Sequence, residues 1–297
     1  MSFSNVIRDE LCRVMPKKPC CALAESYGIL AFGNKFAPDE IRIISEHEGF
    51  VRHAHALFKE ALGVDFDIVS GERWKLELSE RDRIAQIYET FGYDVKKQVV
   101  MHFHGWFCEE DCCMASFLRG AFLSGGVCAD PAKTYHLELA SPRGAFLREL
   151  LLRTSELTFV PHISQRGQNY LLYLKESEQI EDFLTFVGAP SAAMHMMEEK
   201  VLKDYRNKIN RQSNCEFSNI RKTVDAAGAQ VDAILLLAEK NRLSDLPDAL
   251  KETADIRIAF PNATLTELCE KFQPTVSKSC LNHRLRKLMA IAKEIEK

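Results

Sequence analysis

The sequence lacks the long apolar run that a membrane-spanning helix requires. No stretch of about 18 or more apolar residues occurs among the 297 residues of the chain. The N-terminus also has no apolar segment of the kind that a secretory signal peptide carries. These absences exclude a membrane helix and an export signal, and they predict a cytoplasmic protein with no membrane partner.

The sequence also lacks the cysteine spacing of a typical zinc site. Ten cysteines are present, and in a long chain without an export signal reduced thiols are the better interpretation. Cys20-Cys21 and Cys112-Cys113 are adjacent pairs, and neighbouring residues rarely form a disulfide. Cys108 and Cys112 have a zinc-like spacing, but no second pair of comparable form follows. We therefore expect buried structural thiols, with no metal and no cofactor.

Charge is present in ordinary amounts but is unevenly distributed along the chain. The net charge is -3, yet residues 200–297 hold 18 Lys and Arg against 13 Asp and Glu, whereas residues 1–199 hold 21 against 29. The chain is 46% hydrophobic and 27% charged, which is a globular composition, and its length suggests about two domains. A basic C-terminal third is typical of a segment that binds a polyanionic partner. The alternative is that its charges only form a solvated surface.

An internal repeat occupies the first two thirds of the chain. At an offset of 92 residues, Cys20-Cys21 recurs as Cys112-Cys113, Gly28 as Gly120, and Gly33 as Gly125. Each repeat starts with a predicted helix of small and apolar residues, and glycine inside a helix costs about 1 kcal/mol relative to alanine. We expect Gly28 and Gly120 to permit close approach of the two helices. We expect Gly33 and Gly125 to adopt a left-handed conformation at the helix ends.

Similar elements are predicted after both of these helices. Alternating apolar residues predict strands at 40–45, 65–70, 73–78, 134–140, 157–163 and 170–175. Helical periodicity predicts helices at 50–62, 81–91, 143–153 and 180–187. Two such halves predict one domain with pseudo-two-fold symmetry.

The repeated helix resembles the LAGLIDADG motif of homing endonucleases, with residues 26–34 and 118–126 aligned to it. The whole chain resembles the WhiA family of bacterial regulators. This resemblance rests on the Cys-Cys pairs and on MSFS (1–4), LRGAFL (118–123), DP (130–131), YHLE (135–138) and NRQSNCE (210–216). It implies an α+β fold with a pseudo-two-fold LAGLIDADG homing-endonuclease-like domain over residues 1–190, its repeats at about 20–98 and 112–190. A helical linker over 191–229 and an all-α helix-turn-helix domain over 230–297 complete the expected organisation.

The same resemblance indicates that a catalytic group is missing. In active LAGLIDADG nucleases the penultimate motif position is acidic and binds a divalent metal, and the matching positions here are Gly33 and Gly125. Glycine offers no oxygen ligand to Mg²⁺, and without paired carboxylates there is no two-metal route to phosphodiester cleavage. Glu25 and Asp130 are nearby in sequence, but neither stands at a motif end. We expect no enzymatic activity.

Residues 192–229 predict a long helix or a helix pair between the two domains. Within it, the run from Met194 to Met197 is expected to face the core. Basic residues and asparagines gather at 203–211. Because cations neutralise phosphates, Arg206, Lys208 and Arg211 are weaker candidates for DNA contact, with a solvated linker as the alternative.

The C-terminal third predicts a helix-turn-helix from about Thr264 to Glu294. Helices are predicted at 231–240 and 246–258, and Thr264 and Glu267 have the spacing of a capping box that starts a helix ending near 272. Pro274 then interrupts the chain, and a second helix starts near Ser277. Its apolar stripe is Leu281, Leu285 and Leu288.

The opposite face of the second helix carries the candidate DNA-binding residues. They are Lys278, Ser279, Asn282, His283, Arg284, Arg286 and Lys287, and no acidic residue occurs from 277 to 293. Arg286 and His283 are the candidates for base edges, and Lys278, Arg284 and Lys287 for phosphates. In the WhiA family this module is the helix-turn-helix, and residues 276–279 and 282–288 resemble its most characteristic stretch. Cys280 stands where glycine is expected.

Together these features predict a sequence-specific, double-stranded-DNA-binding protein of the nucleoid. The resemblance implies a transcription regulator involved in cell division and chromosome segregation, and in sporulation in some relatives. One alternative is an interaction scaffold of the division machinery, whose N-terminal domain binds protein partners. Another is a residual DNA endonuclease. No small-molecule substrate is expected.

Overall fold

The computed structural model describes residues 2–95 and 101–295 of the chain. Two compact units are present, Met1–Asp204 and Tyr205–Lys297. The predicted boundaries at residues 1, 98 and 297 lie outside the described residues. Within the described part of the chain, no helix is both long and apolar enough to cross a membrane.

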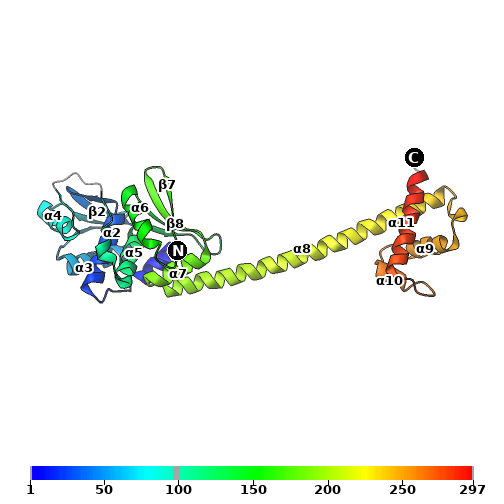
Figure 1. Ribbon diagram of the computed structural model, residues 1–297, viewed down its shortest axis with the longest axis horizontal. Helices are drawn as coiled ribbons and strands as arrows, with labels where there is room; N and C mark the ends of the chain where they lie inside the picture. The colour runs from blue at the N-terminus through cyan, green and yellow to red at the C-terminus, as the bar shows by residue number, and fades with distance from the viewer. Residues whose placement is uncertain (1, 96–100, 296–297) are drawn as a thin grey trace. The chain divides into compact units, whose positions relative to one another are not determined.

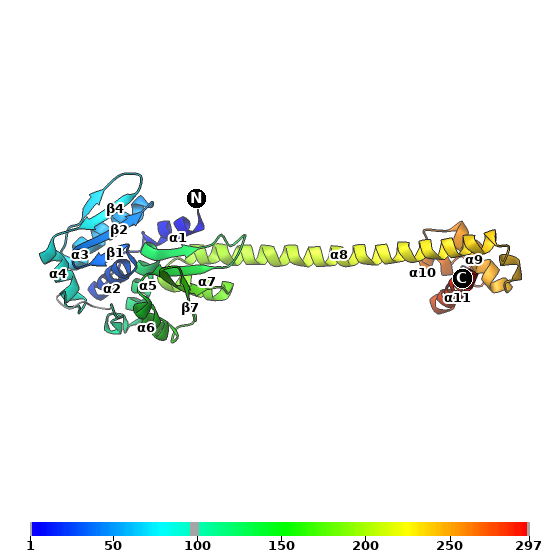
Figure 2. The same ribbon diagram turned by 90° about the horizontal axis from the view of Figure 1, so that it is seen from above.

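A pair of buried helices forms the centre of the first unit. Helix α2 (Pro19–Phe32) and helix α5 (Asp111–Gly125) lie side by side (Figures 1 and 2). A Cβ atom added to Gly28 would lie 2.1 Å from the carbonyl oxygen of Phe117, and one added to Gly120 would lie 2.2 Å from that of Glu25. These two contacts repeat at the offset of 92 residues. The predicted close approach of the two helices is confirmed, because no side chain larger than glycine fits at either position.

Two antiparallel sheets of the same order flank this helix pair, and the first has the order β1-β2-β4-β3. Its strands are β1 (Lys35–Ala37), β2 (Glu40–Ser45), β3 (Asp67–Val69) and β4 (Trp74–Leu78). The second sheet has the order β5-β6-β8-β7. Its strands are β5 (Gly126–Cys128), β6 (Leu137–Ser141), β7 (His162–Arg166) and β8 (Asn169–Leu174). Equal strand order in the two halves agrees with the predicted pseudo-two-fold symmetry.

Further helices complete the first unit. They are α1 (Phe3–Leu11), α3 (Glu48–Leu62), α4 (Arg81–Thr90), the 3-10 helix η1 (Gly105–Cys108), α6 (Gly144–Thr154) and α7 (Ser177–Val187). Helix α1 was not predicted from the sequence, although its buried Phe3, Ile7 and Leu11 have helical spacing. The strand predicted at 157–163 lies later in the chain, because Phe159 is buried in an irregular segment and β7 spans His162–Arg166.

The glycines at the ends of α2 and α5 do not adopt the predicted left-handed conformation. Gly33 has φ −66° and ψ 163°, and Gly125 is not among the residues with positive φ. A Cβ atom on Gly125 would instead lie 2.8 Å from the carbonyl oxygen of Ala140. Glycine is therefore required at Gly125 by the closeness of the neighbouring strand, and not by a backbone angle.

Helix α8 (Pro190–Glu239) is continuous, so residues 192–229 and the predicted helix at 231–240 belong to one helix. The prediction that the run from Met194 to Met197 faces the core was wrong for three of its four residues. Only Met196 is buried, whereas Met194, His195 and Met197 are exposed. Four consecutive residues cover the full circumference of a helix, so they cannot all face one side.

The second unit is a small helical module with its own core. After α8 come the 3-10 helix η2 (Leu243–Asp245), α9 (Asp248–Ala259), α10 (Leu265–Cys269) and α11 (Lys278–Ile295). Helix α10 ends before the predicted residue 272. The core is apolar throughout and comprises Ile234, Leu237, Leu250, Ala254, Leu268, Cys269, Phe272, Leu281, Leu285, Leu288 and Ala292.

Candidate nucleic-acid interface

Helix α11 is held on the second unit by one apolar stripe. Leu281, Leu285 and Leu288 are each only 1% exposed, which confirms the predicted buried face. They share a core with Leu250 and Ala254 of α9, so α11 packs across α9. Because the stripe faces inward, the opposite side of α11 is presented to solvent.

The start of α10 is fixed by a capping box. The Thr264 backbone N–H donates to Oε2 of Glu267 at 2.7 Å, and the Glu267 N–H donates to the Thr264 hydroxyl at 3.3 Å. The predicted capping box is therefore confirmed. The hydrogen bond from the Thr264 N–H holds the pKa of Glu267 below its ordinary value. The buried Arg257 of α9 also donates to the carbonyl of Ala263, at 2.7 Å, which ties α9 to the start of α10.

The first turn of α11 is suited to an anion. The Ser277 hydroxyl accepts a hydrogen bond from the N–H of Cys280 at 3.2 Å, which caps the helix. The first turn contains no acidic residue and includes the exposed Lys278. A helix N-terminus carries a partial positive charge, so this end of α11 favours a phosphate nearby.

Five of the seven candidate residues on α11 are exposed: Lys278, Ser279, His283, Arg286 and Lys287. Asn282 is half-buried beside them. Within residues 2–95 and 101–295, Lys278, Arg286 and Lys287 form no ion pair with a carboxylate. The outward face of α11 therefore carries cations that are available to an external anion.

Arg284 differs from the other six candidates. Its side chain is 22% exposed, and one guanidinium nitrogen lies 3.9 Å from a carboxylate oxygen of Glu252 on α9. The guanidinium also lies over the ring of Phe272, 5.8 Å from its centroid. These contacts hold Arg284 against the module, so its guanidinium is not presented on the outward face of α11 with the exposed candidates.

The weaker candidates on α8 are not brought together with α11. Arg206, Lys208 and Arg211 are all exposed. Arg211 precedes Ile234, where α8 enters the second core, by 23 residues of continuous helix. At about 1.5 Å per residue this is about 35 Å along the helix axis. These residues therefore cannot share a compact site with Arg286.

The motif ends of α2 and α5 carry no acidic group, because Gly33 and Gly125 occupy them. Glu25 is completely buried, and its two oxygens accept hydrogen bonds from Nε2 of His53 at 2.7 Å and Nε of Arg119 at 2.8 Å. Asp130 accepts the N–H of Ala132 at 3.0 Å in a turn. Both oxygens of Glu25 are therefore engaged by internal partners.

One group of thiols is not predicted by the spacing of the cysteines in the sequence. The thiols of Cys20, Cys21 and Cys113 lie within 4.8 Å of one another across the two central helices. The two Cys-Cys pairs were considered separately, and each pair alone has no metal-binding spacing. The signal that could have joined them is the repeat itself, which predicts that α2 and α5 start side by side.

Comparisons with known proteins identify two matching family models. The WhiA LAGLIDADG-like domain matches residues 114–206, and the WhiA C-terminal HTH domain matches residues 209–292. The "Probable cell division protein WhiA" of Ruminiclostridium cellulolyticum is 36% identical over an alignment of 312 residues. The alignment covers 100% of this chain and 99% of the relative. The protein of the same name from Desulfitobacterium hafniense strain Y51 is 35% identical over an alignment of 309 residues, which covers 100% of this chain and 97% of that relative.

A solved structure agrees with these matches. The crystal structure of full-length DUF199/WhiA from Thermatoga maritima is 22% identical, has a TM-score of 0.59, and covers 99% of each chain. The crystal structure of the N-terminal LAGLIDADG domain of DUF199/WhiA, 21% identical with a TM-score of 0.51, covers 63% of this chain and 92% of that one. The expected α+β fold, with a LAGLIDADG-like domain followed by a helix-turn-helix domain, is confirmed.

Proposed function

The chain belongs to the WhiA family, and from this premise we propose that it reads double-stranded DNA through α11 as a transcription regulator. The observation that carries the proposal is the outward face of α11, where Lys278, Arg286 and Lys287 have no carboxylate partner within the described residues. The relatives are named as probable cell division proteins, which supports a role of this regulator in cell division. We propose further that the protein associates with the nucleoid and acts in chromosome segregation, and that some relatives act in sporulation.

The geometry of α11 suits the major groove, which is wide enough to admit a helix. Arg286 can donate two hydrogen bonds to guanine, and His283 and Asn282 can bond neighbouring base edges. Lys278 and Lys287 would contact phosphates, and Ser279 lies in the first turn near the backbone. Residues 191–229 would serve as a helical linker between the DNA-binding module and the LAGLIDADG-like domain.

We also propose that the protein does not cleave DNA. Gly33 and Gly125 stand where active LAGLIDADG nucleases carry metal-binding carboxylates, and the nearby Glu25 is committed to His53 and Arg119. Incubation of the full-length protein with supercoiled DNA in Mg²⁺ or Mn²⁺ should leave the DNA intact. Nicking that copurifies with the protein and is abolished by Asp130→Ala would disprove this part of the proposal.

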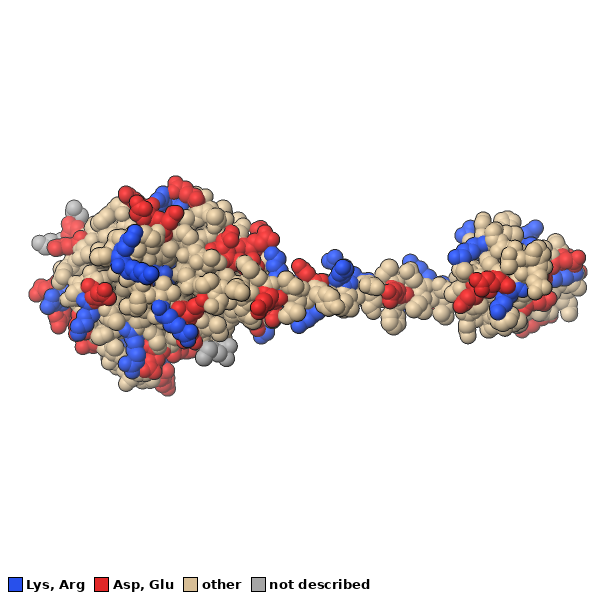
Figure 3. All heavy atoms as spheres, turned by 90° about the horizontal axis from the view of Figure 1, so that it is seen from below, with Lys and Arg blue, Asp and Glu red and all other residues tan. Residues whose placement is uncertain are grey.

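Binding of a protein partner is a second candidate function for the first unit. Its cations are interspersed with carboxylates on the face drawn in Figure 3. On the second sheet, Arg166 lies 2.7 Å and His136 2.9 Å from Glu138, and on the first sheet Lys35 lies 2.9 Å from Glu40. Such a mixed and internally neutralised surface suits a protein better than a polyphosphate.

The test uses the full-length protein and a duplex selected from a randomised pool. Arg286→Ala should weaken binding of the selected duplex by about 1–3 kcal/mol, with less effect on random DNA. Lys287→Ala should weaken both alike and reduce the salt slope by about 1. Lys293→Ala is the matched control, because Lys293 lines a hollow beside Asp232 and Glu239 of α8. Fluorescence anisotropy across a salt series measures all four proteins.

The outcomes separate the alternatives. The recognition-helix assignment is wrong if Arg286→Ala and Lys287→Ala bind like the parent protein. A general polyanion-binding surface is indicated instead if the Lys293→Ala control loses as much affinity as Lys287→Ala.

A further inference from the structure

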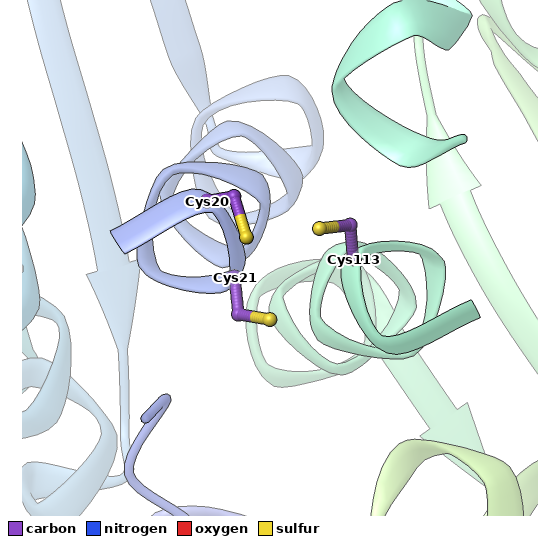
Figure 4. A group of neighbouring side chains, drawn as sticks. All are labelled: Cys20, Cys21 and Cys113. Atoms are coloured by element: carbon purple, nitrogen blue, oxygen red, sulfur yellow. The ribbon is translucent and has the colours of Figure 1, made fainter. Parts of the chain in front are cut away.

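Three cysteines meet where the two central helices begin, and a fourth, Cys112, is adjacent in the chain. Figure 4 shows Cys20 and Cys21 at the start of α2 and Cys113 at the start of α5, with their sulfur atoms directed into the space between the helices. These three Sγ atoms all lie within 4.8 Å of one another. Cys112 precedes Cys113, and its thiol lies 4.0 Å from Nζ of Lys18.

The arrangement follows from the internal repeat. Cys20 and Cys112 each occupy the second position of their helix, and Cys21 and Cys113 the third. The pseudo-two-fold axis between α2 and α5 therefore relates a contact of Cys20 with Cys113 to a contact of Cys21 with Cys112. The first of these contacts is present, because the Sγ atoms of Cys20 and Cys113 lie within 4.8 Å of each other.

The environment of the thiols favours a bound cation. Cys21 and Cys113 are buried, whereas Cys20 and Cys112 are exposed, so the cluster is open on one side. Both helix N-termini add partial positive charge that stabilises thiolates. Thiolates so close together repel one another unless a cation neutralises them.

We propose that Cys20, Cys21 and Cys113, with Cys112 as the fourth ligand, form a zinc site that joins the two repeats of the LAGLIDADG-like domain. Zinc prefers four ligands in a tetrahedron and accepts a full set of cysteine thiolates. Zn–S bonds of about 2.3 Å place the sulfur atoms about 3.8 Å apart, and the Sγ atoms of Cys20, Cys21 and Cys113 already lie within 4.8 Å of one another. A disulfide would require about 2.05 Å between two sulfurs.

Metal binding is balanced by proton release. Four thiols lose four protons to the solvent, four Zn–S bonds form, and the resulting site carries a charge of −2 without any oxidation or reduction. Cys112 is exposed, so its thiol can turn from Lys18 toward the other three. The site would bridge α2 and α5, so zinc should stabilise the domain against unfolding.

The experiment uses reduced, metal-free, full-length protein titrated with Zn²⁺ against a chromophoric chelator, and with Co²⁺ as a spectroscopic probe. We expect one Zn²⁺ per chain, a thiolate-to-cobalt charge-transfer band with tetrahedral d–d bands, and a higher melting temperature with zinc. The double variant Cys20→Ser/Cys112→Ser changes only the exposed pair, so it should fold, lose the cobalt bands and lose the thermal shift. Cys215→Ser/Cys280→Ser is the matched control, because both residues are exposed cysteines outside the cluster.

Three results would overturn the zinc site. Reduced protein that takes up no metal would do so, and so would a Cys20→Ser/Cys112→Ser protein that keeps the cobalt bands. The third is formation of a Cys20–Cys113 or Cys21–Cys112 disulfide when the protein is mildly oxidised by a disulfide reagent, in protein that takes up no metal. This result would identify a redox pair in place of a zinc site.

Discussion

Arginine side chains of this protein show how strongly the role of a single residue depends on its partners. Arg119 is buried and bonded to Glu25, to the hydroxyl of Ser116 and to the carbonyl of Val187. Arg284 is held beside Glu252, whereas Arg286 is exposed without a carboxylate partner in the described part of the chain. Only the last of the three can offer its guanidinium to a base pair without losing an internal contact.

The buried Glu25 should be one of the most sensitive positions of the first unit. Glu25→Gln removes the negative charge that both His53 and Arg119 contact. Loss of one partner of a buried ion pair costs about 3–5 kcal/mol, because the other charge stays buried and uncompensated. Urea denaturation of the full-length protein, followed by a probe in the first unit, should show this loss.

The matched control is Glu46→Gln. Glu46 is 73% exposed and lies 3.1 Å from Arg73. Exposed pairs contribute about 0–1 kcal/mol, so this variant should unfold almost like the parent. Similar destabilisation by both substitutions would show that the buried contacts of Glu25 are not special.

At the scale of elements, the contact between α2 and α5 determines how the two repeats pack. Gly120→Leu places a side chain against the backbone of α2, so we expect destabilisation of about 1–3 kcal/mol or more. Gly71 lies in an open turn, where an added Cβ would find its nearest neighbour 3.8 Å away. Gly71→Leu should therefore leave the melting temperature almost unchanged. Equal shifts for both variants would rule out a tight helix interface.

The capping box of α10 should stabilise the second unit measurably. Thr264→Ala removes the hydroxyl that accepts the Glu267 N–H, at a cost of about 0.5–2 kcal/mol. Thr266→Ala, an exposed threonine in the same helix, is the control. Thermal unfolding followed in the second unit measures both variants, and equal stability of the two would show that the cap contributes nothing.

The capping box also makes a pH-dependent contribution. The pKa of Glu267 is lowered from 4.5 by its hydrogen bonds to Thr264. This stabilisation is therefore fully present above pH 4.5 and is lost as the pH falls through the lowered value.

At the scale of the whole molecule, the two units have separate apolar cores. A fragment of residues 205–297 should therefore fold by itself and bind duplex DNA with the salt slope of the full-length protein. A fragment of residues 1–204 should fold but bind duplex DNA only weakly. Circular dichroism checks folding, and anisotropy checks binding. DNA binding by the 1–204 fragment alone would transfer the DNA-binding role to the first unit.

The sequence alone determined the features that depend on residues close together in the chain. The stripe Leu281, Leu285 and Leu288 and the Thr264–Glu267 box depend on residues within two helical turns, so periodicity predicts them. The repeat, with glycine at both motif ends, can be read by comparing the chain with itself. Residue identity alone shows, whatever the packing, that no carboxylate stands at Gly33 or Gly125.

Tertiary structure decided which distant residues meet. Glu252 pairs with Arg284 across two helices, Phe159 is buried in an irregular segment, and Ala140 closes the space around Gly125. The Cys-Cys pairs likewise became one cluster only when α2 and α5 packed with their starts together. Such contacts join residues far apart in the chain, so the local sequence pattern does not predict them. They form only when separate elements bury their apolar faces against one another.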